Sequence, residues 1–176
     1  MTLPMLTALL LLAAPSVTPS GPPPAGRTGL DVPIVAQAPE RCGPAALEMV
    51  LRFYGAGPAA LREAGSAYDP ALRGSLITDL AAAARRAGYD ATVATLDPDS
   101  LVALLGAGVP PIVLYQNGRA VLTVAHFGVV SGWDPARGVF TLNDGGSRPR
   151  VLGHDDLAKR WRTAGSQALV IRRRSP

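Results

Sequence analysis

Apolar residues recur at helical spacing in the N-terminal half of the chain. In residues 42–55, CGPAALEMVLRFYG, the positions i, i+3, i+4 and i+7 of one helix face are occupied by Leu47, Val50, Leu51 and Tyr54. Pro44 suits the first turn of a helix, where its missing N–H costs nothing. A helix is therefore predicted from Cys42 to a stop at Gly55.

A second helix is predicted to start at Ser75 and to stop at Gly88, because SLITDLAAAARRAG again has apolar residues at helical spacing. The residues of this helix that we expect in the core are Ile77, Leu80, Ala81 and Ala84. A short third helix is predicted at residues 98–106, PDSLVALLG. The segments on either side of it, ATVATL and VPPIVLYQNG, predict strands, the second of which ends in a turn at Asn117-Gly118.

The segment 121–144 has the pattern of a β-hairpin. The β-branched apolar run from Val121 to Val130 predicts a strand, DPARG predicts a turn, and residues 139–142 predict the returning strand. If the turn is centred near Pro135 or Ala136, the numbers of antiparallel partners sum to about 271. His126 is then expected opposite Asp144 or its neighbour.

The order of these elements predicts an α+β fold, in which the helix that bears Cys42 packs against a mostly antiparallel sheet that bears His126 and Asp144. At 176 residues, 48% of them hydrophobic, the chain is long enough for one domain with a sizeable core but too short to argue for two. We expect this domain to cover residues 30–174.

The N-terminal residues have the pattern of an export signal. An apolar run from Leu6 to Ala14, followed by small residues, is typical of a secretory signal peptide and is too short to span a bilayer comfortably. We expect a signal peptide at residues 1–18 and a Pro/Gly-rich linker at residues 19–29. The predicted location is therefore periplasmic or extracellular, without stable membrane insertion once the signal is cleaved. Because no Lys or Arg precedes the apolar run, an uncleaved N-terminal membrane anchor is the alternative.

The net charge of +4 does not indicate a nucleic-acid partner. Much of the basic character lies in scattered arginines and in the terminal run 172–174, a pattern that is typical of a solvated tail. Basic residues interleaved with aromatic residues, as in a nucleic-acid footprint, are not seen in the sequence.

Cys42 is the only cysteine, so the chain cannot form an internal disulfide. At the start of a helix, unpaired backbone N–H groups and the macrodipole stabilise a thiolate and lower the pKa of the thiol. This favours a catalytic nucleophile. The alternative is a structural cysteine that is buried at the helix start as a small apolar residue.

Cysteine catalysis needs a base, and the sequence has only two histidines. His126 lies on a predicted strand, and Asp144 could hold its ring from the second nitrogen. Asn143 is a competitor, because a shift of one residue in register exchanges the two side chains. Asp134, at the hairpin tip, is expected roughly 25 Å from His126 at strand rise. His154 is expected to precede the last helix, and one cysteine with two histidines forms no recognisable metal site, so no metal or cofactor is expected.

Four segments occur in an order that resembles a known family: VPIVAQAPERCGPAALEMVLRFYG, GSLITDLAAAARRAGYDATV, AHFGVVSGWD and FTLND. They are similar to the bacteriocin-processing, double-glycine leader peptidase-like group of papain-like cysteine peptidases, in particular to its free-standing exported branch. The resemblance covers most of residues 32–172 and implies a papain-like fold and hydrolysis of a peptide or protein substrate.

The same resemblance implies a role for each site residue. Cys42 would be the nucleophile, His126 the base, Asp144 the orienting acid and Gln37 the oxyanion-hole residue. A side-chain amide beside the N–H of Cys42 would give a tetrahedral oxyanion two donors.

The chain also departs from the family. Members fused to peptide-exporting ABC transporters often carry an acidic residue before the cysteine, where this chain has Arg41. The double-glycine specificity of those members is therefore not carried over, and Gly145-Gly146 is interpreted as a turn. Two other functions stay open: an acyltransferase or transglutaminase-like enzyme that uses the same residues, and a non-catalytic peptide-binding domain.

Overall fold

The computed structural model describes residue 26, residues 28–119 and residues 122–174. The helices are α1 (Cys42–Phe53), α2 (Pro58–Gly65), α3 (Ile77–Arg86), α4 (Pro98–Gly106) and α5 (His154–Thr163). The strands are β1 (Thr28–Gly29), β2 (Tyr89–Thr95), β3 (Ile112–Arg119), β4 (Leu122–Asp134), β5 (Val139–Asn143), β6 (Arg150–Gly153) and β7 (Gln167–Arg173). None of the helices in these ranges is long and apolar enough to cross a membrane.

The expected signal peptide, residues 1–18, lies outside the described residues, as does most of the expected linker. The last two residues of that linker form β1, which pairs with Gly132 and Trp133 of β4.

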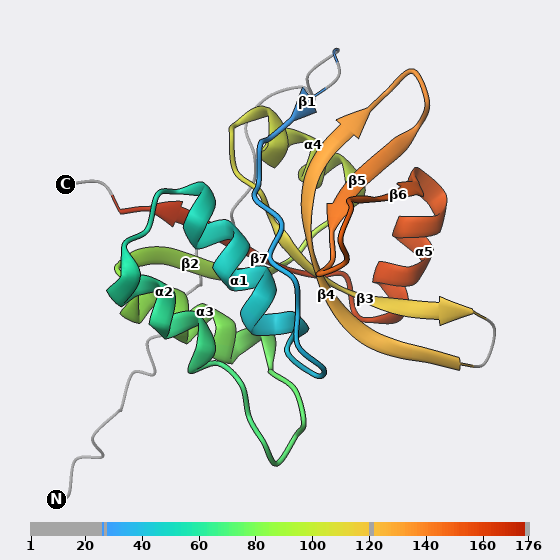
Figure 1. The fold of residues 1–176 in the computed structure, drawn as a ribbon. Coiled ribbons are helices and arrows are strands. Elements are labelled where there is room, and N and C mark those ends of the chain that lie inside the picture. The colour runs from blue at the N-terminus through green and yellow to red at the C-terminus, as the bar shows by residue number, and fades with distance from the viewer. Residues whose placement is uncertain (1–25, 27, 120–121, 175–176) are drawn as a thin grey trace, which may run out of the picture.

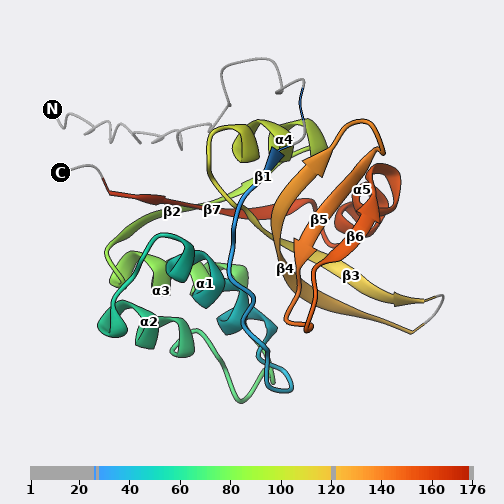
Figure 2. The ribbon, with the colours of Figure 1, turned by 45° about the horizontal axis from the view of Figure 1, so that its top comes forward.

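The strands form one antiparallel sheet in the order β2-β7-β3-β4-β5-β6 (Figure 1). β7, the last strand in the sequence, lies between β2 and β3. Figure 2 shows α1, α2 and α3 grouped on one side of the molecule and α5 beside the β3–β6 part of the sheet. The predicted arrangement of helices on a mostly antiparallel sheet, an α+β fold, is confirmed.

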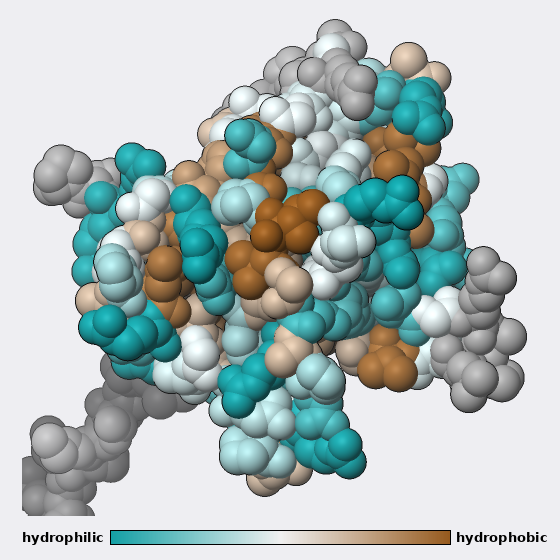
Figure 3. Space-filling model, viewed as in Figure 1, coloured by the Kyte–Doolittle hydropathy of each residue, from teal (hydrophilic) through white to brown (hydrophobic). Residues whose placement is uncertain are grey.

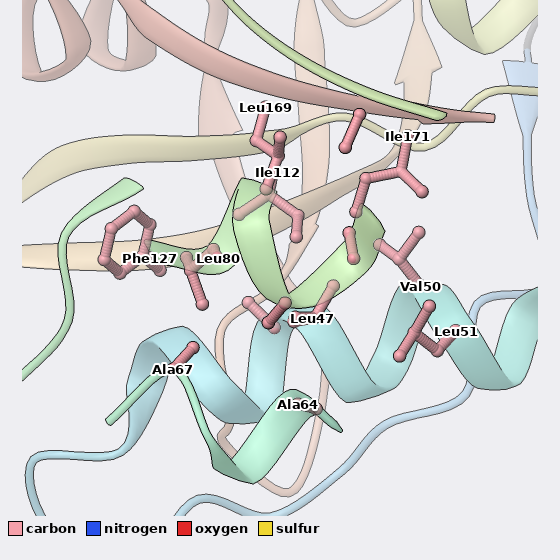
Figure 4. Close-up of a cluster of buried hydrophobic side chains, with 14 of the residues drawn as sticks. Leu47, Val50, Leu51, Ala64, Ala67, Leu80, Ile112, Phe127, Leu169 and Ile171 are labelled. Atoms are coloured by element: carbon pink, nitrogen blue, oxygen red, sulfur yellow. The ribbon is translucent and has the colours of Figure 1, made fainter. Parts of the chain in front are cut away.

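Both faces of the sheet are covered. Successive strand residues face opposite sides, so neighbouring residues of one strand enter different clusters. Ile112, Val129 and Leu169 pack against α1, α2 and α3 in one buried cluster (Figure 4). Their sequence neighbours Val113, Val130 and Ala168 pack in a second cluster with residues of α4 and α5. Trp161 of α5 is fully buried in that second cluster, and its indole Nε1 donates to the carbonyl of Gln167 at 2.8 Å.

The predicted core face of α1 is confirmed, since Leu47, Val50 and Leu51 are fully buried. Helix α1 ends before Gly55, whose φ of +75° suits glycine. Tyr54, just past the helix, donates its hydroxyl to the carbonyl of Ile171 at 2.9 Å and so ties this end of α1 to β7.

Two predicted boundaries are wrong. Helix α3 begins at Ile77, two residues later than expected from Ser75. The expected turn at Asn117-Gly118 is part of β3, because Asn117 pairs with Val124 and Gly118 with Thr123 of β4. The hydrogen-bonded ladder with β4 outweighs the local turn preference of the Asn-Gly pair.

Large apolar side chains are scattered on the surface. In Figure 3 the hydrophobic residues form small groups among hydrophilic ones on the face shown. The exposed large apolar residues of the described chain are Ile34, Leu72, Leu76, Val124 and Val151. Three of them lie around one cleft, which is described next.

Candidate active site

Cys42 is the first residue of α1, as predicted, and is partly buried. The residue before it, Arg41, makes no side-chain capping hydrogen bond to the helix, and the first turn contains no acidic residue. The positive end of the helix dipole therefore acts on the sulfur without a competing side-chain acceptor. The backbone N–H of Gly43 supplies one hydrogen bond to the thiol.

The side chains of Cys42 and His126 of β4 line the same cleft and lie close enough for each to shift the pKa of the other through hydrogen bonding and charge. Burial raises the pKa of the Cys42 thiol, but the hydrogen bonds from His126 and from the backbone of Phe127 outweigh burial, and the net pKa is lowered. Burial lowers the pKa of His126, but its hydrogen bonds with Cys42 and with the backbone of Asp144 outweigh that effect, and the net pKa is raised. Both shifts favour a thiolate beside an imidazolium.

The second nitrogen of the ring is also held. Nε2 of His126 donates to the backbone carbonyl of Asp144 at 2.9 Å, which leaves Nδ1 for the thiol. The Asp144 carboxylate points elsewhere: its Oδ2 lies 3.2 Å from the hydroxyl of Tyr115 and 3.0 Å from Nε of Arg150. Sequence reasoning placed Asp144 beside His126 but expected the carboxylate to hold the ring. The main chain makes that contact, because Arg150 and Tyr115 engage the side chain.

The register of the β4–β5 hairpin differs slightly from the prediction. Partner numbers sum to 272 at Val129 and Asn143 and to 273 beyond a bulge near Ser131, not to about 271. β5 ends at Asn143, so Asp144 lies just past the ladder.

Asn143, the predicted competitor, is engaged away from the histidine. It is buried, its side-chain Nδ2 donates to the carbonyl of Val32 at 2.8 Å, and its Oδ1 is 3.5 Å from the hydroxyl of Ser131. Asp134 is the last residue of β4 and pairs with Val139, far along the strand from His126.

Gln37 lies in the same cleft as Cys42 and His126. Its side chain rests directly on the backbone of Gly145: a Cβ at that glycine would lie 2.5 Å from the Gln37 amide oxygen. The backbone N–H of Gln37 also donates to the carbonyl of Gly145 at 3.4 Å. The amide oxygen is buried and has no hydrogen-bond partner among the described residues, which is the kind of unsatisfied polar group that functional sites retain.

The cleft has a volume of about 590 Å³. One side is formed by the loop before α3, where Leu72 and Leu76 are more than half exposed, and the other by β4, where Val124 is 71% exposed. At the mouth, the Arg73 guanidinium pairs with the Glu40 carboxylate. The reactive pair is therefore open to an extended chain that lies between two apolar sides.

His154 was expected to cap or precede the last helix and is instead its first residue, because Gly153 is the residue that caps α5. Its ring contacts those of Trp133 and Phe140, and its Nδ1 lies 2.8 Å from a carboxylate oxygen of Asp155. These contacts place His154 in a different environment from that of Cys42.

Sequence reasoning missed Tyr115 and Arg150. A two-residue turn at Asn117-Gly118 would pair Tyr115 with residue 120, whereas in the sheet Tyr115 pairs with His126. Arg150 had no signal of its own, because one arginine among many in a polar segment shows no partner.

Comparisons with known proteins identify the family of the chain. The model of the Peptidase_C39 like family matches residues 29–169. No significant match was found among curated proteins.

Solved structures share the fold at low sequence identity. A double glycine motif protease from the AMS/PCAT transporter, solved with its leader peptide, is 23% identical with a TM-score of 0.64 over 87% of this chain and 98% of that one. A putative C39-like peptidase from Bacillus anthracis is 17% identical with a TM-score of 0.66 over 85% and 99%. Xylellain, a cysteine protease from Xylella fastidiosa, is 12% identical with a TM-score of 0.59 over 93% and 91%.

The family model covers most of the domain, including Cys42, His126 and Asp144, and these structures share the arrangement of helices on the sheet. The chain belongs to the Peptidase_C39 like family and is a cysteine peptidase with the papain-like α+β fold.

Proposed function

We propose that the chain hydrolyses peptide bonds through Cys42, His126, Asp144 and Gln37. The Cys42 thiolate attacks the scissile carbonyl carbon and forms a tetrahedral oxyanion. The His126 imidazolium then gives its proton to the leaving amine, the C–N bond breaks, and a thioester remains. Neutral His126 next takes a proton from water, whose oxygen displaces the sulfur. Asp144 holds the ring throughout.

The observation that carries this proposal is that Cys42, at the start of α1, and His126 line the same open cleft, close enough for each side chain to shift the pKa of the other. A structural cysteine would need neither a histidine partner nor a helix N-terminus, and burial alone would raise the pKa of its thiol. Here the pKa of the thiol is lowered despite burial.

The oxyanion is assigned to two donors, the backbone N–H of Cys42 and the side-chain amide of Gln37. The support for Gln37 is its place in the cleft and its contact with Gly145. One such donor typically contributes about 3 kcal/mol to the transition state.

The substrate class is a peptide or an unfolded protein segment. The similar double glycine motif protease was solved in complex with a leader peptide, which supports a peptide substrate for this chain. We further propose that the enzyme acts after export, as the apolar N-terminal run suggests, in the periplasm or outside the cell.

The first test is the rate at which iodoacetamide alkylates Cys42 as a function of pH, in the wild type and in His126→Ala. Rapid alkylation well below pH 8 that is lost in His126→Ala is the expected result. An ordinary thiol midpoint in both proteins would refute the proposal and would favour the peptide-binding domain.

With labelled casein as substrate, Cys42→Ala should abolish cleavage. An excess of added amine separates hydrolysis from acyl transfer, because a transferase would incorporate the amine faster than it releases acid.

A further inference from the structure

The Asp144 carbonyl that holds His126 is not fixed by the sheet. β5 ends at Asn143, and the next residue after Asp144, Gly145, has a φ of +81°, so the chain turns out of the ladder at this point. A carbonyl just past a strand end has no neighbouring strand to set its direction. Another contact must fix it if His126 is to keep one orientation.

The Asp144 side chain supplies that contact. The side chain is 9% exposed and its carboxylate is held from two strands. The Tyr115 hydroxyl of β3 donates to Oδ2 at 3.2 Å, and Nε of Arg150, the first residue of β6, lies 3.0 Å from the same oxygen. Arg150 is itself anchored, because its NH1 donates to Oδ1 of Asn117 at 2.6 Å.

Tyr115 contacts both the Asp144 carboxylate and the ring of His126. It pairs with His126 in the β3–β4 ladder, the two rings lie edge to face with centroids 5.7 Å apart, and the tyrosine is fully buried. Gly128 leaves room for it: a Cβ there would lie 3.2 Å from the Tyr115 ring and 3.6 Å from the Cβ of Asp144. A larger residue at position 128 would crowd both.

We propose that Tyr115 and Arg150 are positioning residues for catalysis, which clamp the Asp144 carboxylate so that the Asp144 main-chain carbonyl, and not the carboxylate, orients His126. This inference rests on the proposed function of Cys42 and His126. It assigns the aspartate a different task from that of an acid that touches the imidazole: the negative charge anchors the loop, and the peptide carbonyl makes the contact with the ring.

His126 could be oriented by the Asp144 carboxylate or by the Asp144 carbonyl, and the two arrangements predict opposite effects of removing Arg150 on thiol reactivity. If the carboxylate oriented the ring directly, removal of Arg150 would free it for His126 and would leave thiol reactivity unchanged or raise it. If the clamp positions the carbonyl, removal of Arg150 leaves a nearly buried carboxylate unpaired, the loop shifts, and reactivity falls.

The test measures iodoacetamide alkylation of Cys42 between pH 5 and 9, which needs no substrate. The variants are Tyr115→Phe, which keeps the ring packing and removes only the hydroxyl, Arg150→Met, and Arg150→Lys. Arg86→Met, which breaks an exposed ion pair with Glu63, is the matched control. The ¹⁵N chemical shifts of His126 report whether Nε2 keeps its hydrogen bond.

We expect Tyr115→Phe to slow alkylation at pH 6.5 by about tenfold, the factor of one hydrogen bond to a charged group, and Arg150→Met to slow it by more than that. Arg150→Lys should recover part of the rate, because it restores the charge without the fork that also reaches Asn117. Arg86→Met should match the wild type. The His126 Nε2 resonance should shift in the slowed variants.

Wild-type rates and an unshifted His126 resonance in Tyr115→Phe and Arg150→Met would overturn the inference. If Arg150→Met does not fold, Tyr115→Phe decides alone. An ordinary thiol midpoint in the wild type would instead refute the proposed function, so the two failures are distinguishable.

Discussion

The reactivity of Cys42 depends on contributions of opposite sign. Burial favours the neutral thiol, whereas His126, the backbone of Phe127 and the helix N-terminus favour the thiolate. For His126, burial favours the neutral ring and the contacts with Cys42 and Asp144 favour the cation. Hydrogen bonds and charge interactions together outweigh burial at both residues, so the charged pair is favoured although water is partly excluded.

These directions predict a bell-shaped pH profile of kcat/KM. Activity requires the thiolate, so it should rise through a thiol pKa that lies below the usual value of about 8.5. It also requires the imidazolium, so it should fall through a His126 pKa that lies above the usual value of about 6.5. The profile would be measured with labelled casein. An acid limb at the ordinary thiol pKa would contradict the prediction.

Substitutions of Asp144 should separate its main chain from its side chain. Asp144→Asn keeps an acceptor for Tyr115 and should lower kcat/KM by about tenfold, whereas Asp144→Ala removes the anchor and should lower it by about a hundredfold. Single-turnover kinetics with labelled casein would measure both. Equal losses of a hundredfold or more in both variants would show that the site requires the negative charge of Asp144 and that a neutral acceptor for Tyr115 is not enough.

The turn that follows β5 places the Asp144 carbonyl and supports Gln37. Gly145 has a positive φ. Because it has no side chain, the Gln37 amide can lie directly against its backbone. The loop before α1 and the turn after β5 thus meet at one residue. The position of the oxyanion donor depends on this contact.

Gly145→Ala is expected to lower stability by about 1 kcal/mol because of the positive φ, and also to displace Gln37 and reduce kcat by about tenfold. Gly138→Ala is the matched control, because Gly138 has a φ of +62° but open space around its Cα. Thermal unfolding should show similar losses in both variants. If kcat is unchanged in Gly145→Ala, Gln37 is not held by this turn.

The sequence predicted the elements correctly where local preferences for helix, strand or turn agree with the packing of the core. The core face of α1 and the strand that bears His126 follow from periodicity, since burial of one face selects the pattern. The turn at Asn117-Gly118 was wrong because strand pairing overrides local turn preference. The contact of Asp144 could not be predicted, because it depends on a bulge near Ser131 and on Arg150, which comes from another strand.

The molecule as a whole brings Cys42 and His126 together through the packing of two parts. One part consists of α1, α2, α3 and β2, and the other of the strands from β3 to β6. β7 joins them within the sheet: Leu169 pairs with Val93 of β2 and with Ile112 of β3. The same side chain is fully buried in the cluster under α1.

Leu169→Ala should therefore lower the free energy of unfolding by roughly 3 kcal/mol, the usual cost of a buried leucine truncated to alanine. Because the two parts share this strand, the loss of helical circular dichroism and the loss of activated Cys42 alkylation should coincide in urea. Val151→Ala, at a half-exposed strand position, should change stability by less than about 0.5 kcal/mol. Separate transitions for the two signals would show that the parts unfold independently.

The position of β7 also bears on when the enzyme becomes active during its synthesis. The strand that joins the nucleophile part to the histidine part is synthesised after all the other strands of the sheet, and long-range pairing of this kind forms late. A nascent chain that already carries Cys42 and His126 still lacks β7, the strand between β2 and β3. We expect such a chain to be unable to cut itself or its neighbours until β7 has been made and has paired.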